Sequence, residues 1–258
     1  RFEKAENDMK IGVQLQPQAT SMAELREAWE RVDAMGLDSL WTWDHFYPLH
    51  GDPDAAHFEC YTILAAMAAT TKNLQIGAMV TCNSYRNPQL LADMARTIDH
   101  ISGGRFVLGI GSGWFERDYL EYGYDFGTAP GRLRRLGDDL PVLKDRLAKL
   151  KPAPIGPLPL LIGGGGEKVT LRLVARHAQM WNGFGTPVEL QAKHAIIDQW
   201  CEVEGTDPAA IERTTAQTPD PDLDLDAFAA AGVQHIIFSV GHPYDLSAVE
   251  AVLARARA

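Results

Sequence analysis

This chain of 258 residues has little cysteine and contains no long apolar run. Its three cysteines, Cys60, Cys82 and Cys201, are far apart and odd in number, which argues against a disulfide framework and against a zinc site. They fit a reducing compartment, so we predict a cytoplasmic location. No stretch approaches the roughly 18 apolar residues of a membrane span. Arg1 to Asp8 is polar and charged, so we expect residues 1–9 to form a polar N-terminal tail rather than a signal sequence.

An excess of positive charge is also missing. The 24 Lys and Arg residues are interspersed among 34 Asp and Glu residues, which gives a net charge of −10. No basic stripe suits nucleic acid or an anionic membrane, so we predict neither as a partner. His50 and His57 follow His45, but neither His-Glu-x-x-His nor Cys-x-x-Cys accompanies them. We therefore predict no metal site, and a metal-dependent hydrolase is disfavoured.

Short apolar runs alternate with longer amphipathic ones along the chain, as in repeated strand-helix units around a parallel sheet. We expect strands at residues 10–16, 39–44, 74–81, 106–111, 159–163, 180–184, 214–218 and 235–240. Capping-box spacing predicts helix starts at Ser21, Thr186 and Ser247. Eight such units predict an α/β fold, a (β/α)8 TIM barrel formed as one domain by residues 10–258, whose chemistry gathers at the carboxyl ends of the strands.

A run of four glycines, Gly163, Gly164, Gly165 and Gly166, follows the fifth predicted strand and leads into a helix predicted over residues 167–176. Glycine lets the backbone approach an anion closely, and the first amides of a helix have no intrahelical partner. We interpret the run as a binding site for a phosphate-bearing cofactor. The alternative is a tight strand-to-helix turn, for which one or two glycines suffice.

The second predicted strand ends at Asp44 and His45, which places both at the expected functional end of the barrel. Histidine titrates near neutral pH and so suits general acid-base catalysis. We take His45 as the catalytic candidate, with a histidine hydrogen-bonded within a loop as the alternative. Asp44 either orients the imidazole or caps a turn.

The third and fourth predicted strands end in small and polar residues. No base accompanies Cys82, so we interpret it as a packing residue rather than a nucleophile. The glycines at positions 109, 111 and 113 lack a full dinucleotide fingerprint, and in a barrel we expect them to clear space for a ligand. Trp114 and Phe115, which follow, form either a pocket wall or simple packing.

Several segments together resemble the luciferase-like flavin-dependent superfamily, and within it the branch of coenzyme F420-dependent oxidoreductases. They are Trp43-Asp44-His45-Phe46, residues 77–88 and 109–116, Tyr122-Gly123 with Asp125-Phe126-Gly127, and residues 161–182. The resemblance implies a barrel that binds a deazaflavin, with the ring over the barrel mouth and the phosphate on the glycine run. It also implies a homodimer. The connections at residues 150–158 and 218–222 are shorter than is usual in this family.

The resemblance also assigns residues to the cofactor. His45 matches the histidine that faces the reactive carbon of the ring, with Asp44 beside it. Met79-Val80 matches a non-prolyl cis peptide that forms a bulge behind the ring. The remaining matches are Cys82 and Asn83 at the polar edge of the ring, Gly113 and Trp114 in the pocket wall, and Gly163, Gly164, Gly165 and Gly166 around the phosphate.

The implied activity is hydride transfer between coenzyme F420 and a small organic substrate, with His45 supplying or removing the accompanying proton. Two alternatives remain open. One is an FMN-dependent luciferase-like monooxygenase, which the sequence separates poorly from the first interpretation. The other is a non-catalytic deazaflavin-binding protein, which binds the cofactor and reduces no substrate.

Overall fold

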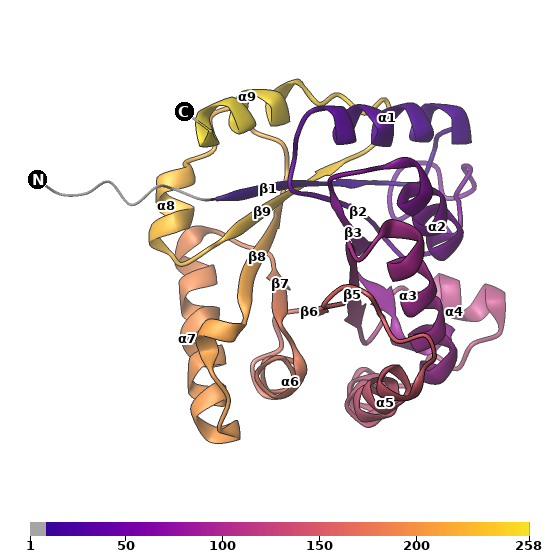
Figure 1. Ribbon diagram of the computed structural model, residues 1–258, viewed down its shortest axis with the longest axis vertical. Helices are drawn as coiled ribbons and strands as arrows, with labels where there is room; N and C mark the ends of the chain where they lie inside the picture. The colour runs from indigo at the N-terminus through magenta and orange to yellow at the C-terminus, as the bar shows by residue number, and fades with distance from the viewer. Residues whose placement is uncertain (1–8, 258) are drawn as a thin grey trace, which may run out of the picture.

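The strands form one closed parallel barrel with the helices outside it (Figure 1). The computed structural model describes residues 9–257. The strands are β1 (Lys10–Leu15), β2 (Ser39–Thr42), β3 (Gln75–Ala78), β4 (Thr81–Cys82), β5 (Phe106–Gly111), β6 (Leu160–Gly163), β7 (Met180–Gly183), β8 (Glu212–Gln217) and β9 (His235–Val240). The hydrogen-bonded order runs β3-β2-β1-β9-β8-β7-β6-β5-β4, and pairing of β3 with β5 closes the ring. The predicted (β/α)8 barrel is confirmed.

One predicted strand is broken in two. Residues 74–81 were expected to be continuous, but β3 ends at Ala78 and β4 begins at Thr81. Both pieces pair with β5, Gly77 with Val107 and Thr81 with Ile110, so three residues on one side oppose two on the other. The extra residue makes a bulge. The Met79-Val80 peptide inside the bulge is cis, as the family resemblance implied.

The helices follow the strands in the expected alternation. They are α1 (Met22–Ala34), α2 (Cys60–Thr70), α3 (Pro88–Ser102), α4 (Glu116–Tyr122), α5 (Ala129–Lys149), α6 (Thr170–His177), α7 (Pro187–Glu204), α8 (Leu225–Ala230) and α9 (Ser247–Ala256), with 3-10 turns η1 (Asn83–Tyr85) and η2 (Pro208–Ala210). The capping boxes predicted at Ser21 and Thr186 are confirmed. The one predicted at Ser247 is wrong, because Leu246 is the N-cap residue and the Ser247 amide donates to the Asp245 carboxylate.

The apolar core of the described residues lies mainly inside the barrel and between the barrel and the helices, and a third, smaller cluster packs Cys82, Tyr85 and Tyr119 together. The inner part consists of Trp41, Met79, Val107, Leu161, Met180, Ala216 and Ile237. Neighbouring strand residues such as Leu40, Phe106 and Ile236 point outward and pack with the buried faces of the helices. The barrel is therefore a filled scaffold, and only its mouth is available for a ligand.

The predicted N-terminal tail falls mostly outside the part of the chain that the structure describes. Residues 1–8 lie outside the described residues, whereas Met9 is 3% exposed and packs in the outer core. The apolar side chain of Met9 belongs with β1, which follows it directly, rather than with the polar residues before it. Among the helices of residues 9–257, none is both long and apolar enough to span a membrane.

Candidate active site

A cavity of about 430 Å³ opens at the carboxyl ends of the barrel strands. It is lined by Gln14, Trp43, Asp44, His45, Leu49, Met79, Val80, Thr81, Cys82, Gly111, Ser112, Gly113, Trp114, Gly163, Gly164, Asn182, Phe184 and Ser239. Its volume lies within the range of small-ligand sites. Its position is the one expected for the active site of a (β/α)8 barrel, because loops from several strands converge there.

Most of the residues that the sequence predicted as site residues line this one cavity. His45 and the first two glycines of the run, Gly163 and Gly164, share it, as do Met79, Val80, Cys82, Gly113 and Trp114. The other two glycines, Gly165 and Gly166, are exposed and lie outside the lining. Asn83 also lies outside it, because its side chain is buried and donates to Asp139 of α5 at 2.8 Å.

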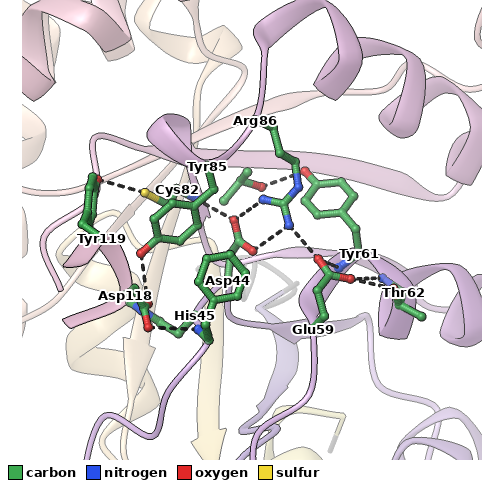
Figure 2. A network of polar contacts seen from close by, with 12 residues as sticks. Asp44, His45, Glu59, Tyr61, Thr62, Cys82, Tyr85, Arg86, Asp118 and Tyr119 are labelled. Atoms are coloured by element: carbon green, nitrogen blue, oxygen red, sulfur yellow. Dashed lines mark hydrogen bonds and ion pairs between the residues drawn. The ribbon is translucent and has the colours of Figure 1, made fainter. Parts of the chain in front are cut away.

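The carboxylate that holds His45 is Asp118 of α4. His45 is 9% exposed, and its Nδ1 lies 2.7 Å from Oδ2 of the fully buried Asp118 (Figure 2). The same oxygen accepts the Tyr85 hydroxyl at 3.0 Å, and the other accepts the amides of Phe46 and Tyr47. With Nδ1 engaged, Nε2 is the nitrogen of His45 that is left for a ligand, and it has no partner among residues 9–257.

Asp44 faces away from this pair, so of the two roles left open for it, orienting the imidazole is not the one that its contacts show. Its two carboxylate oxygens receive the guanidinium of Arg86 at 2.6 and 3.0 Å, and one also accepts the Cys82 amide (Figure 2). Arg86 donates as well to Glu59 at 2.7 Å. Burial by itself lowers the pKa of Arg86, but the Asp44 carboxylate outweighs burial and raises it, so the guanidinium stays charged. Asp44 therefore ties the loop after β2 to the end of the broken third strand.

Sequence reasoning missed both Asp118 and Arg86. A signal for Asp118 existed in the helical spacing, because Phe115, Asp118 and Tyr119 fall on one face of a helix and an acidic residue on an apolar face needs a partner. Asp118 and Tyr119 are indeed buried, while Glu116 on the same helix is exposed. No comparable signal identified Arg86, since a single arginine after a strand is usually solvated.

Gly109 and Gly111 of β5 make room for the protein's own atoms, while Gly111 and Gly113 also line the cavity, where we expected these glycines to clear space for a ligand. A Cβ at Gly109 would lie 1.9 Å from the carbonyl oxygen of Ala78, and one at Gly111 would lie 2.8 Å from Cγ2 of Val80. A Cβ at Gly163 of the next strand would also meet Val80, at 2.9 Å. These glycines therefore accommodate the bulge at Met79-Val80 and let it project into the cavity.

The last glycine of that group serves a different contact. Gly113 has φ +81, and a Cβ there would lie 2.0 Å from the Tyr119 hydroxyl and 2.5 Å from Sγ of Cys82. The Cys82 thiol and the Tyr119 hydroxyl lie 3.1 Å apart. Burial raises the pKa of Cys82 to about 11, so its thiol stays protonated near neutral pH and packs rather than attacks.

The glycine run leads into a helix that starts later than predicted. The α6 helix begins at Thr170, three residues beyond the predicted start at Glu167. Gly164 has φ +118, a conformation open to glycine, and its amide donates to the Asn182 carbonyl. The amides of Gly165, Gly166 and Glu167 have no hydrogen-bond partner in the part of the chain that the structure describes. The loop thus presents unpaired donors beside the cavity.

A second polar cluster lies at the opposite end of the barrel and takes no part in this site. His235 Nε2 lies 2.8 Å from the Ser39 hydroxyl, and its Nδ1 lies 3.0 Å from Glu212. This order of groups resembles a hydrolase relay, but Ser39 and His235 are both 0% exposed, so no substrate reaches them. Within residues 9–257, no group of three or more His, Cys, Asp and Glu is arranged to hold a metal ion.

These features define an α/β-barrel protein with a histidine-carboxylate pair and a glycine-rich loop at one mouth. The family model described as "Luciferase-like monooxygenase" matches residues 9–219. The chain therefore belongs to the luciferase-like monooxygenase family, as the resemblance indicated.

Among the relatives of known name, one is an F420-dependent dehydrogenase and another is a monooxygenase. The chain is 28% identical over 178 residues to an F420-dependent glucose-6-phosphate dehydrogenase of Amycolatopsis mediterranei, covering 62% of this chain and 53% of the relative. It is 27% identical over 174 residues to a 4-hydroxyprotoasukamycin monooxygenase of Streptomyces nodosus subsp. asukaensis, covering 61% and 46%. The matches thus span about half the length of these two curated relatives.

A solved structure supports the fold over nearly the whole chain. An F420-dependent secondary alcohol dehydrogenase, in complex with an F420-acetone adduct, superposes with a TM-score of 0.83 at 17% identity. The match covers 97% of this chain and 99% of that one. At this identity the likeness establishes the shared barrel.

Proposed function

We propose that this protein is an oxidoreductase that transfers a hydride between the deazaflavin coenzyme F420 and a small organic substrate. One observation carries the proposal: His45, the cis Met79-Val80 bulge and the start of the glycine run meet at a single cavity. Relatives named as F420-dependent appear in both the sequence and the structure comparisons, which supports the same cofactor.

The residues present fit such a cofactor. The unpaired amides of Gly165, Gly166 and Glu167 suit a phosphate group, because successive free backbone N–H groups in a glycine-rich loop can bind an anion. Asn182 is 2% exposed and lines the cavity, and its Oδ1 accepts from Thr214 while its amide nitrogen has no partner within residues 9–257. That nitrogen is a donor for the polar edge of a flavin-like ring, in place of Asn83.

The other cavity residues take the places that the family resemblance gives them. We propose that Met79 and Val80 support one face of the ring, that Cys82 lies near its edge, and that Gly113 and Trp114 form a wall. The phosphate then extends over the run from Gly163 to Gly166.

When bound, F420 would supply the redox chemistry, as hydride acceptor or hydride donor for the small organic substrate. His45 exchanges the accompanying hydroxyl proton through Nε2, because Asp118 engages Nδ1. Asp118 acts as a positioning residue that fixes the orientation of the imidazole. The rings of Trp43, Trp114 and Phe115 pack edge-on around the imidazole and place apolar surface beside it.

Titration of the purified protein with F420 and, separately, with FMN tests the cofactor, since the two absorb at different wavelengths. We expect saturable, stoichiometric binding of F420. We then expect His45→Ala to lower turnover about 100-fold or more, the usual scale of general acid-base catalysis, and to leave the F420 dissociation constant within a few-fold. Unchanged turnover in His45→Ala would remove the histidine from the mechanism.

An FMN-dependent monooxygenase is the second candidate: the Streptomyces nodosus relative is named as a monooxygenase, and a solved structure that shares the fold is a monooxygenase in complex with FMN. It requires that FMN binds in preference to F420 and that oxygen is consumed with the substrate. A non-catalytic deazaflavin-binding protein is a third outcome of the same titration, with stoichiometric F420 and no substrate turnover.

The quaternary structure and the location are also proposals. We propose a homodimer, supported by the exposed apolar residues Leu90 and Ile101 on α3, which are 55% and 45% exposed. They line a hollow between α2 and α3. The cytoplasmic location stays a prediction based on the reduced cysteines, all three of which are free and buried.

A further inference from the structure

We infer that the aromatic side of the cavity, beside His45, accepts uncharged aromatic or alicyclic substrates and rejects anionic ones, whereas the glycine side is the part proposed for the cofactor phosphate. This inference rests on the proposed function, whose reaction leaves the substrate class open. The first observation is the lining itself. Among the residues that the structure describes, no Lys or Arg lines the cavity, and its only ionisable side chains besides the thiol of Cys82 are Asp44 and His45.

The charges just behind the lining are negative in balance. Asp44 in the lining and Glu59 and Asp118 behind it are three carboxylates, whereas the single guanidinium of Arg86, paired with Asp44 and Glu59, offsets only one of these negative charges. Arg86 is engaged by both carboxylates, so it has no charge left over for a ligand. An anionic substrate beside His45 would therefore meet buried carboxylates without a free cation, and its desolvation would go uncompensated.

A nearby arginine is directed elsewhere. Arg132 is 9% exposed and lies outside the lining. Its guanidinium donates to the carbonyl oxygens of Gly113 and Phe126 and lies 3.9 Å from the ring centroid of Phe126. These contacts hold Arg132 against the backbone behind the cavity wall, so it offers no cation at the position where a substrate would meet His45.

The surface around His45 is aromatic. The rings of Trp43, Trp114 and Phe115 lie edge-on to the imidazole, with centroids 6.1, 5.9 and 5.5 Å away. The Trp43 indole N–H already donates to His57 at 3.0 Å. Burial and the neighbouring His45 lower the pKa of His57 to about 4, so His57 is neutral at pH 7 and accepts that bond. Trp43 thus offers a ligand only apolar surface.

The outer wall is also apolar and is open to solvent. Trp114 is 62% exposed and Phe184 is 74% exposed, although both line the cavity. Large exposed aromatic side chains at a cavity mouth gain burial when a planar or alicyclic ligand covers them. A neutral ring with one hydroxyl or carbonyl group fits this arrangement, because its single polar group pairs with His45 Nε2.

Three small ligands of the same size test the inference: benzyl alcohol, benzoate and benzylammonium. Their dissociation constants are measured by calorimetry with and without F420, and glucose 6-phosphate serves as a second anionic probe. We expect benzyl alcohol to bind at least about tenfold more tightly than benzoate, and glucose 6-phosphate to show no saturable binding. Benzoate binding as tightly as benzyl alcohol, or no binding by any probe, overturns the inference.

Two variants connect the preference to the cavity wall. Trp114→Ala should weaken benzyl alcohol binding about fivefold to tenfold, the scale of one aromatic contact. Trp114→Lys should strengthen benzoate binding, because it places a cation beside the cavity. Val203→Ala is the control, since Val203 is exposed on α7 and lies outside the lining. Equal effects of Trp114→Ala and Val203→Ala contradict the assignment.

The separate F420 titration distinguishes two failures. If F420 does not bind but benzyl alcohol is still preferred over benzoate, the proposed function fails and the ligand class stands. If F420 binds and benzoate is preferred, the inference fails and the proposed function stands.

Discussion

Replacing Asp118 by Asn tests whether the buried carboxylate sets up His45 for proton transfer. The carbonyl oxygen of the amide can still accept the N–H groups of Phe46 and Tyr47. Its NH2 group then takes the place of Oδ2, where it meets both His45 Nδ1 and the Tyr85 hydroxyl. Because an NH2 group only donates, Nδ1 must become an acceptor, which moves the imidazole proton to Nε2 and reverses its role.

The magnitude follows from the bond that is lost. A hydrogen bond to a charged group contributes roughly 1.5–3 kcal/mol, and the 2.7 Å contact between His45 and Asp118 is fully buried on the aspartate side. At about 1.4 kcal/mol for each factor of ten, we expect kcat to fall about 10- to 150-fold. The F420 dissociation constant should stay within a few-fold, because Asp118 does not line the cavity.

The assay combines steady-state turnover, F420 titration, thermal unfolding and the solvent deuterium isotope effect on kcat. A positioning role predicts a larger isotope effect in Asp118→Asn, because proton transfer becomes slower, whereas a merely structural role would leave it unchanged. Tyr85→Phe is the matched control, since it removes the hydrogen bond that the Tyr85 hydroxyl donates to the same Asp118 oxygen and keeps the carboxylate charge. It should lower kcat less than about tenfold. A kcat for Asp118→Asn within twofold of the parent protein refutes the reasoning.

Two further predictions concern stability. Gly109→Ala places a Cβ 1.9 Å from the Ala78 carbonyl oxygen and should lower the free energy of unfolding, measured by urea titration, by about 3 kcal/mol. Gly137→Ala places a Cβ 3.5 Å from Leu173 and should raise the free energy of unfolding by about 0.5–1 kcal/mol. A Gly109→Ala variant as stable as the parent protein contradicts the packing argument. Burial alone raises the pKa of Glu212, but the hydrogen bonds from His235 and Lys10 outweigh it and lower the pKa from 4.5 to about 2. The stabilisation that the ionised Glu212 gives the folded state is fully present above pH 4.5 and is lost as the pH falls toward 2. The free energy of unfolding of the parent protein should therefore fall by up to about 3 kcal/mol over that range. Glu212→Gln should show a flatter curve of unfolding free energy against pH. Parallel curves of unfolding free energy against pH for the parent protein and Glu212→Gln would contradict this role of Glu212.

The barrel and the end that carries its site were predictable because both follow from rules that act along the chain. Alternating apolar runs identify strands, and parallel strands joined by helices place their carboxyl ends together. His45 and Gly163 are far apart in sequence, yet His45 lies three residues beyond the end of β2 and Gly163 ends β6, which was enough to bring them to one cavity.

The partner of His45 was not predictable in the same way. Asp44 is adjacent to His45 in sequence, but both lie in the loop beyond β2, which ends at Thr42, and there their side chains face different partners. Asp118 reaches the imidazole from a helix 73 positions later in the chain. The helical spacing marks Asp118 as a buried acid that needs a partner, but which residue it meets depends on how α4 and the loop before it pack, and the local pattern does not give that.

The Val80 side chain, set against Gly111 and Gly163, gives the two sides of the cavity unequal freedom to change. One side consists of barrel backbone from adjacent strands, where even a methyl group disturbs the neighbours. The other consists of Trp114 and Phe184, whose mostly exposed rings contribute little to the fold. Mutations that change which ligand binds can therefore accumulate on the aromatic side while the glycine side is held constant. Proteins with this architecture can then acquire new substrates without destabilising the barrel.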